Sequence, residues 1–119
     1  MAELIKNIDK STVLDFADLV TYQEGQVVSR TLAQNNALSL TLFAFPIGEG
    51  ISAHTVPADA LVQVLDGEAK VTIDGQEYRV GAGQAIVMPQ GKPHALDAEK
   101  PFKMLLVVVK APQQTLNQL

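Results

Sequence analysis

Two histidines are the residues of this sequence whose type and spacing could support chemistry. His54 and His94 are the only imidazoles among its 119 residues, and each follows a turn rich in glycine or proline, at the expected start of a strand. An imidazole titrates near neutral pH, so it can ligate a metal ion, act as a general base or bind a ligand by hydrogen bonds. The alternative is that both are hydrogen-bonded interior histidines.

The segments around these histidines have the pattern of short strands. Turn residues recur every eight to twelve positions, and between them lie runs rich in β-branched residues, such as VVSRTL, LSLTLFAF, ALVQVL and KMLLVVV. This spacing is typical of an all-β sandwich or barrel. TIDGQEYRV predicts a hairpin with a type I′ turn at Asp74 and Gly75, and DGE at 66–68 indicates another turn. STVLDFADLV fits either a short helix capped by Ser11 or Thr12, or a strand.

Composition excludes several classes of protein. The length predicts one domain. There are no cysteines, so disulfides, thiolate metal sites and cysteine nucleophiles are excluded. The net charge is −4 and the basic residues are dispersed, which argues against nucleic-acid binding. The longest apolar run, MLLVVV, is too short to span a membrane, and MAELIKNIDK does not resemble a signal peptide. We therefore expect no membrane partner and a cytoplasmic protein.

The turn before His94 carries a family resemblance. Gly83, five residues, Pro89, one residue, Gly91, two residues and His94 form a spacing that resembles the second motif of the cupin family. One position departs from that motif, since Ala98 stands where the family has asparagine. The glycines permit sharp reversals of the chain, and Pro89 ends the preceding strand.

The segment HTVPADALVQVLDG at 54–67 resembles a degraded first cupin motif. Aligned on Gly67, His54 occupies the first histidine position, Val56 the second, and Ala60 the glutamate position. The resemblance covers about residues 38–109. It implies a double-stranded β-helix, the cupin jelly-roll barrel, and a homodimer. We accordingly expect one cupin domain over 1–119, with an N-terminal arm or strands at 1–25, a core at 38–109 and a peripheral tail at 110–119.

The resemblance also predicts a pocket. Alternate residues of a strand share a face, and in the family this face lines the barrel interior. The expected pocket residues are His54, Val56, Ala60, Val62, Val64, His94, Leu96 and Ala98. The pocket is thus largely apolar, with His54 and His94 as a reduced metal site that could hold a divalent ion such as zinc, nickel, copper or iron weakly.

The sequence is compatible with three functions. The first is a small-molecule-binding protein whose apolar pocket is oriented by the two histidines. The second is a metal-dependent cupin enzyme of the dioxygenase, isomerase or decarboxylase type with a His₂ site. The third is a structural dimer with a vestigial pocket. The expected dimer interface involves the segment Val13–Val20 and the outward residues Leu61, Gln63 and Leu65.

Overall fold

The computed structural model describes residues 3–112, and its regular secondary structure is almost entirely β-strand. Eight strands follow one 3-10 helix, η1, at Phe16–Leu19. The strands are β1 (Val28–Gln34), β2 (Leu38–Phe45), β3 (Gly50–His54), β4 (Ala58–Ile73), β5 (Gln76–Gly81), β6 (Ala85–Met88), β7 (His94–Asp97) and β8 (Phe102–Lys110). The all-β jelly-roll prediction is confirmed. Part of the expected tail, 113–119, lies outside the described residues.

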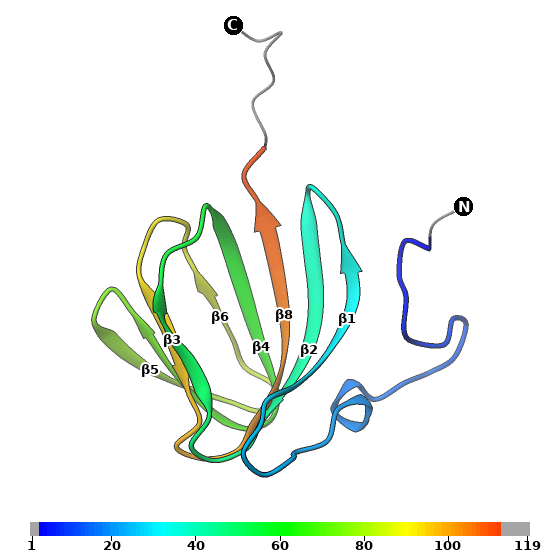
Figure 1. The fold of residues 1–119 in the computed structure, drawn as a ribbon, viewed down its shortest axis with the longest axis horizontal. Coiled ribbons are helices and arrows are strands. Elements are labelled where there is room, and N and C mark those ends of the chain that lie inside the picture. The colour runs from blue at the N-terminus through cyan, green and yellow to red at the C-terminus, as the bar shows by residue number, and fades with distance from the viewer. Residues whose placement is uncertain (1–2, 113–119) are drawn as a thin grey trace, which may run out of the picture.

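All strand pairings are antiparallel, and β4 joins the two halves of the fold. Hydrogen bonds link the strands in the order β1-β2-β8-β4-β7-β3, and β5 and β6 also pair with β4. The first part of β4 lies between β8 and β6, and its last part between β5 and β7. Together the strands curl around a common interior, as Figure 1 shows.

The predicted turn at DGE is wrong, because β4 passes through it without interruption. The register of β4 against β8 shifts between Val64 and Asp66, and Gly67 has a φ of +74°. A Cβ at Gly67 would collide with the carbonyl oxygen of Pro101. The glycine therefore permits a β-bulge, and this bulge bends the strand from one half of the fold into the other.

The hairpin prediction is confirmed. Ile73 pairs with Gln76, and the two residues between them, Asp74 and Gly75, have φ values of +50° and +84°. Positive φ at both central positions is the signature of a type I′ turn, whose twist matches that of the flanking strands.

The N-terminal arm packs on the outer face of β1, β2 and β8. Its one helical element is η1, which is preceded by Asp15 without a side-chain cap, so the expected cap at Ser11 or Thr12 is wrong. Val20 is buried in a cluster with Leu32, Leu42 and Ala44. Lys103 Nζ donates to the Ala17 carbonyl oxygen at 2.6 Å. The single helix of the described part is far too short to cross a bilayer.

The main core lies between the two halves of the fold. Inward residues of β4 and β8 alternate with outward ones, and Val62, Val64, Phe102 and Met104 are fully buried. Val109, on the outer face of β8, is 56% exposed. The arm covers only part of the outer face, which leaves the end of β8 open.

Candidate functional site

The two histidines lie side by side although forty residues separate them in the sequence. β3 and β7 pair antiparallel, and His54 is the register partner of His94. Their ring centroids are 4.5 Å apart with an interplanar angle of 69°, which is an edge-to-face contact. His94 begins β7 as expected, but His54 ends β3 instead of beginning a strand.

Hydrogen bonds at the turn before β7 hold His94 in place. Gly91, with a φ of +76°, donates its N–H to the Val56 carbonyl oxygen at 3.1 Å. The Asp74 N–H donates to the Pro93 carbonyl oxygen at 2.8 Å. The turn is thereby tied to the segment after β3 on one side and to the β4–β5 hairpin on the other, so the imidazole has a defined direction.

The hydrogen bond made by His54 determines its tautomer. Its Nδ1 lies 3.0 Å from the carbonyl oxygen of Ser52. A carbonyl can only accept, so Nδ1 carries the proton and donates. In the neutral ring Nε2 is then left with its lone pair, available to a hydrogen-bond donor or a metal ion.

His94 is the buried partner of the pair, with only 4% of its surface exposed. Burial lowers its pKa, and the nearby His54 lowers it further, while the Lys92 backbone acts in the opposite direction. No hydrogen-bonding geometry is formed at its Nδ1 by any group in residues 3–112. A buried nitrogen without a hydrogen-bond partner destabilises the folded state, so such an atom in a native structure is often part of a functional site.

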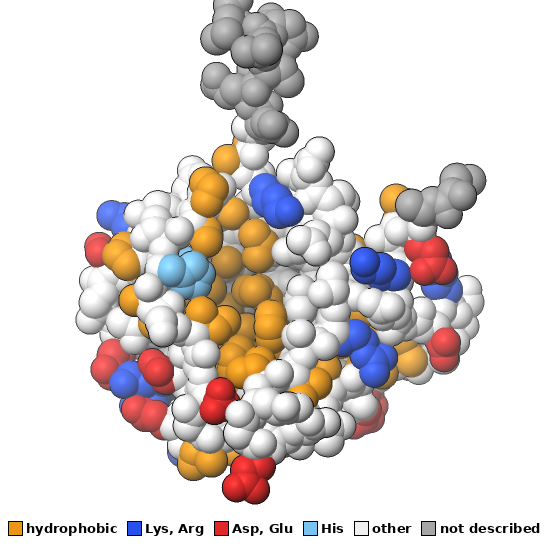
Figure 2. All heavy atoms as spheres, viewed as in Figure 1, with side chains coloured by type: hydrophobic (Ala, Val, Ile, Leu, Met, Phe, Trp, Pro, Cys, Tyr) orange, Lys and Arg blue, Asp and Glu red, His pale blue; other side chains and the backbone are white. Residues whose placement is uncertain are grey.

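Both rings line a partly open cavity of about 110 Å³, here called the inner cavity. Its lining residues are Ile51, His54, Val56, Ala60, Met88, His94, Leu96, Leu106 and Val108. Apart from the histidines the lining is entirely apolar. Figure 2 shows apolar side chains gathered in a hollow of the molecule with a histidine at its edge.

Five of the eight residues predicted for the pocket line this cavity: His54, Val56, Ala60, His94 and Leu96. The other three lie elsewhere. Val62 and Val64 are fully buried in the core farther along β4. Ala98 is buried beyond the end of β7, beside a separate surface depression.

Four lining residues were missed by sequence reasoning. Leu106 and Val108 are the register partners of Val62 and Ala60, so alternation along MLLVVV could have identified them. Met88 likewise pairs with Ala60. Ile51 gave no such signal, because an irregularity between Ile51 and His54 breaks the alternation of β3.

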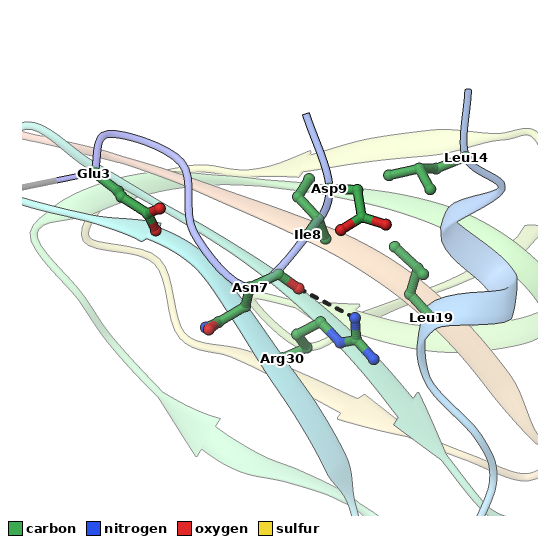
Figure 3. Close-up of a pocket in the computed structure, with 7 residues that line it drawn as sticks. All are labelled: Glu3, Asn7, Ile8, Asp9, Leu14, Leu19 and Arg30. Atoms are coloured by element: carbon green, nitrogen blue, oxygen red, sulfur yellow. Dashed lines mark hydrogen bonds between the residues drawn. The ribbon is translucent and has the colours of Figure 1, made fainter. Parts of the chain in front are cut away.

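A separate pocket lies between the N-terminal arm and the outer face of the sheet. It has a volume of about 350 Å³, and Arg30 and Asn7 are among the residues that line it. Figure 3 shows the Arg30 guanidinium directed at the carbonyl oxygen of Asn7, to which it donates at 3.1 Å. The guanidinium therefore already has a partner, and its side chain fastens the arm to β1.

The donor set at the inner cavity is too small for a catalytic metal centre of ordinary composition. Catalytic zinc usually has three protein ligands, whereas the cavity offers two imidazoles and no carboxylate. No group of three His, Cys, Asp or Glu side chains anywhere in residues 3–112 could hold a metal ion. Val56 and Ala60, at the expected ligand positions, present only hydrocarbon.

Comparisons with known proteins agree with this fold. The family profile described as a cupin domain matches residues 41–109. A conserved protein of unknown function from Streptococcus pyogenes is 46% identical with a TM-score of 0.90, and the alignment covers 94% of this chain and 98% of that one. No protein of curated function matches this chain.

Two further solved structures are similar. A cupin superfamily protein from Desulfitobacterium hafniense is 33% identical with a TM-score of 0.85, over 90% of this chain and 98% of that one. A cupin 2 conserved barrel domain protein from Leptotrichia buccalis is 46% identical with a TM-score of 0.77, over 79% of this chain and 46% of that one.

Proposed function

This chain belongs to the cupin family, and from that premise we propose that it binds a small organic molecule in the inner cavity. The observation that carries the proposal is the edge-to-face pair of His54 and His94 in an otherwise apolar wall. Ligand sites typically combine an apolar lining with a few placed polar groups that orient the ligand. Two imidazoles of different character provide that orientation.

The size of the cavity limits what can enter. A volume of about 110 Å³ is somewhat below that of an engineered apolar cavity of about 150 Å³ that binds benzene. The part of the ligand that enters is therefore about as large as a five- or six-membered ring. Ile51, Leu96 and Leu106 supply its hydrophobic contacts.

The histidines supply polar contacts of two kinds. His54 offers the Nε2 lone pair, which accepts a hydrogen bond from a hydroxyl or N–H group of the ligand. His94 is held neutral by burial at physiological pH and contributes a second ring to the same wall. A hydroxyl or N–H group on the buried part of a ligand can therefore be bound there, and an unsubstituted aromatic ring can pack against the two imidazoles.

The alternative function is a metal-dependent cupin enzyme with a reduced His₂ site. The observation that favours this enzyme is that two imidazoles face one cavity, because neutral imidazole is a common metal ligand. The two hydrocarbon side chains at Val56 and Ala60 count against it. A cytoplasmic location and a homodimer remain predictions from the sequence.

The binding proposal can be tested with a neutral probe, 3-phenylpropan-1-ol. We expect saturable binding with a Kd on the order of 1 mM, since small ligands of this size gain limited free energy per atom. Imidazole ¹⁵N chemical shifts of His54 and His94 should move with the same Kd.

A pair of variants shows whether the probe occupies the inner cavity. Val56→Phe adds bulk to the lining and should abolish binding, whereas Val109→Phe, on the exposed outer face, should leave it unchanged. The proposal is wrong if the imidazole shifts do not respond, or if both variants bind the probe as the parent does.

A further inference from the structure

A second space, here called the outer hollow, lies beside the inner cavity at the end of β8. It has a volume of about 480 Å³ and shares Val56 and Val108 with the inner cavity. The shared residues make the two spaces neighbours along one wall. A ligand that contacts the histidines and is longer than the inner cavity would extend along Val56 and Val108 toward the outer hollow.

Strand alternation places a lysine in this outer hollow. Met104, Leu106, Val108 and Lys110 are alternate residues of β8 and share the inward face. On β4 the partner of Val108 is Ala60 and the partner of Lys110 is Ala58. Lys110 thus continues the wall of the inner cavity by one step, about 7 Å along the strand beyond Val108.

The Lys110 ammonium group has more N–H donors than its one hydrogen bond uses. Its Nζ donates to the Asn35 carbonyl oxygen at 2.7 Å, and an ammonium group has three N–H donors. That hydrogen bond holds the side chain at the outer hollow, where Asn36 also lies in the lining. The remaining N–H groups can be directed at a bound anion.

The linings of the two spaces hold no acid that would neutralise this charge. Among the residues that form them, neither space includes an Asp or Glu side chain. Asp59, the neighbour of Ala58, has the opposite strand parity, and its Oδ1 accepts the Gln90 N–H at 2.8 Å. The cavity system is therefore positive in a chain whose net charge is −4, which favours an anionic ligand.

We propose that the ligand is a small monocarboxylic acid, with an apolar ring or short chain against His54 and His94 and its carboxylate on Lys110. The inference rests on the proposed binding function and specifies the class of ligand. Ile51 and Leu106 contact the apolar part, and the carboxylate lies at the solvent end, where it keeps part of its hydration. Lys110 is in this account the residue that selects acids over neutral molecules.

The test compares 3-phenylpropionate with 3-phenylpropan-1-ol, which has the same carbon skeleton and no charge. In the parent protein we expect the acid to bind about two- to fivefold more tightly, the range for an ion pair at a solvent-exposed site. Calorimetric titration of both probes at neutral pH measures the ratio directly.

Three variants assign the preference to Lys110. Lys110→Met should bring the ratio of the two affinities close to one, whereas Lys110→Arg should retain the preference because it keeps the charge. Lys100→Met removes the same charge at the opposite end of β8, where the side chain is 70% exposed, and should leave the ratio unchanged. Circular dichroism confirms that each variant is folded.

Each outcome bears on one proposal. If both probes bind the parent equally, or if Lys110→Met keeps the preference for the acid, the ligand class is wrong and the binding function stands. If neither probe binds the parent, the binding function itself is wrong and the inference falls with it.

Discussion

His54 and His94 are register partners on neighbouring antiparallel strands, and their rings meet edge to face with centroids 4.5 Å apart. The pairing puts both imidazoles on the wall of one apolar cavity, although His54 belongs to the first cupin-like motif and His94 to the second. One ring is exposed and its tautomer is determined by the Ser52 carbonyl, while the other is buried. Two chemically different polar groups therefore face one small space.

The first prediction concerns pH and stability. Burial lowers the pKa of His94 below its ordinary value of 6.5 in the native state, so the unfolded chain binds more protons in the window between the native pKa and 6.5. The free energy of unfolding should therefore be at its full value above about pH 6.5 and fall as the pH decreases through this window. Urea denaturation at several pH values from neutrality downward measures this loss.

The matched variant is His94→Gln, which cannot titrate. Its urea midpoint should be lower than that of the parent at neutral pH but should change less with pH between 7.5 and 5.5. If the midpoints of the parent and the variant fall in parallel, the titration of His94 does not cause the loss.

The second prediction concerns metal binding. The parent should bind zinc or nickel weakly, and more weakly at lower pH, because both rings must be neutral to act as ligands. Val56→His combined with Ala60→Glu adds two donors to the wall that already carries His54 and His94. Affinity should rise by more than about 100-fold, since loss of even an outer partner of a metal ligand costs 10–100-fold. Equal affinities by calorimetry would show that the two side chains do not face the imidazoles.

The third prediction concerns the dimer expected from the sequence. The arm covers Leu65, which packs in the outer cluster, so this residue is removed from the expected interface. On the uncovered part of the same face Val87 is 48% and Val109 is 56% exposed. A contiguous apolar face of this kind favours association. Leu61→Lys combined with Gln63→Lys should convert the dimer to monomer in sedimentation velocity.

A control for charge alone is Ser52→Lys with Gln76→Lys, since both residues are exposed and lie on β3 and β5 in the other half of the fold. This variant should stay dimeric. A monomeric parent protein at micromolar concentration would contradict the dimer, and a dimeric Leu61→Lys and Gln63→Lys variant would exclude this face as the interface.

The fourth prediction concerns the bulge in β4. Gly67→Ala places a Cβ against the Pro101 carbonyl oxygen at a φ of +74°, and we expect a loss of about 3 kcal/mol in the free energy of unfolding. Gly75→Ala has a similar φ of +84° but open space around the new atom, so about 1 kcal/mol is expected. Equal losses in chemical denaturation would mean that the contact with Pro101 is relieved at little cost.

Strand alternation explains how much of the site the sequence could predict. Along β4 and β7 it predicted Ala60 and Leu96 as pocket residues, and both line the inner cavity. It could not show where the cavity ends, because Val62 has the same parity but is sealed by core packing.

Irregular backbone accounts for the remaining differences. Ile51 joins the wall through the irregularity in β3, and the bend at Gly67 resembles a turn in sequence because both need a positive φ. Neither feature has a periodic signal. The role proposed for Lys110 depends on the length of β8, which local composition does not determine.

We expect an organic ligand to occupy the space beside the two imidazoles. A crystal structure of the protein with saturating 3-phenylpropionate would show whether it does. We predict density for the phenyl ring in contact with His54, His94 and Leu106, and for the carboxylate within hydrogen-bonding distance of Lys110 Nζ. A structure in which side chains fill the inner cavity and the acid is bound elsewhere or not at all would contradict it.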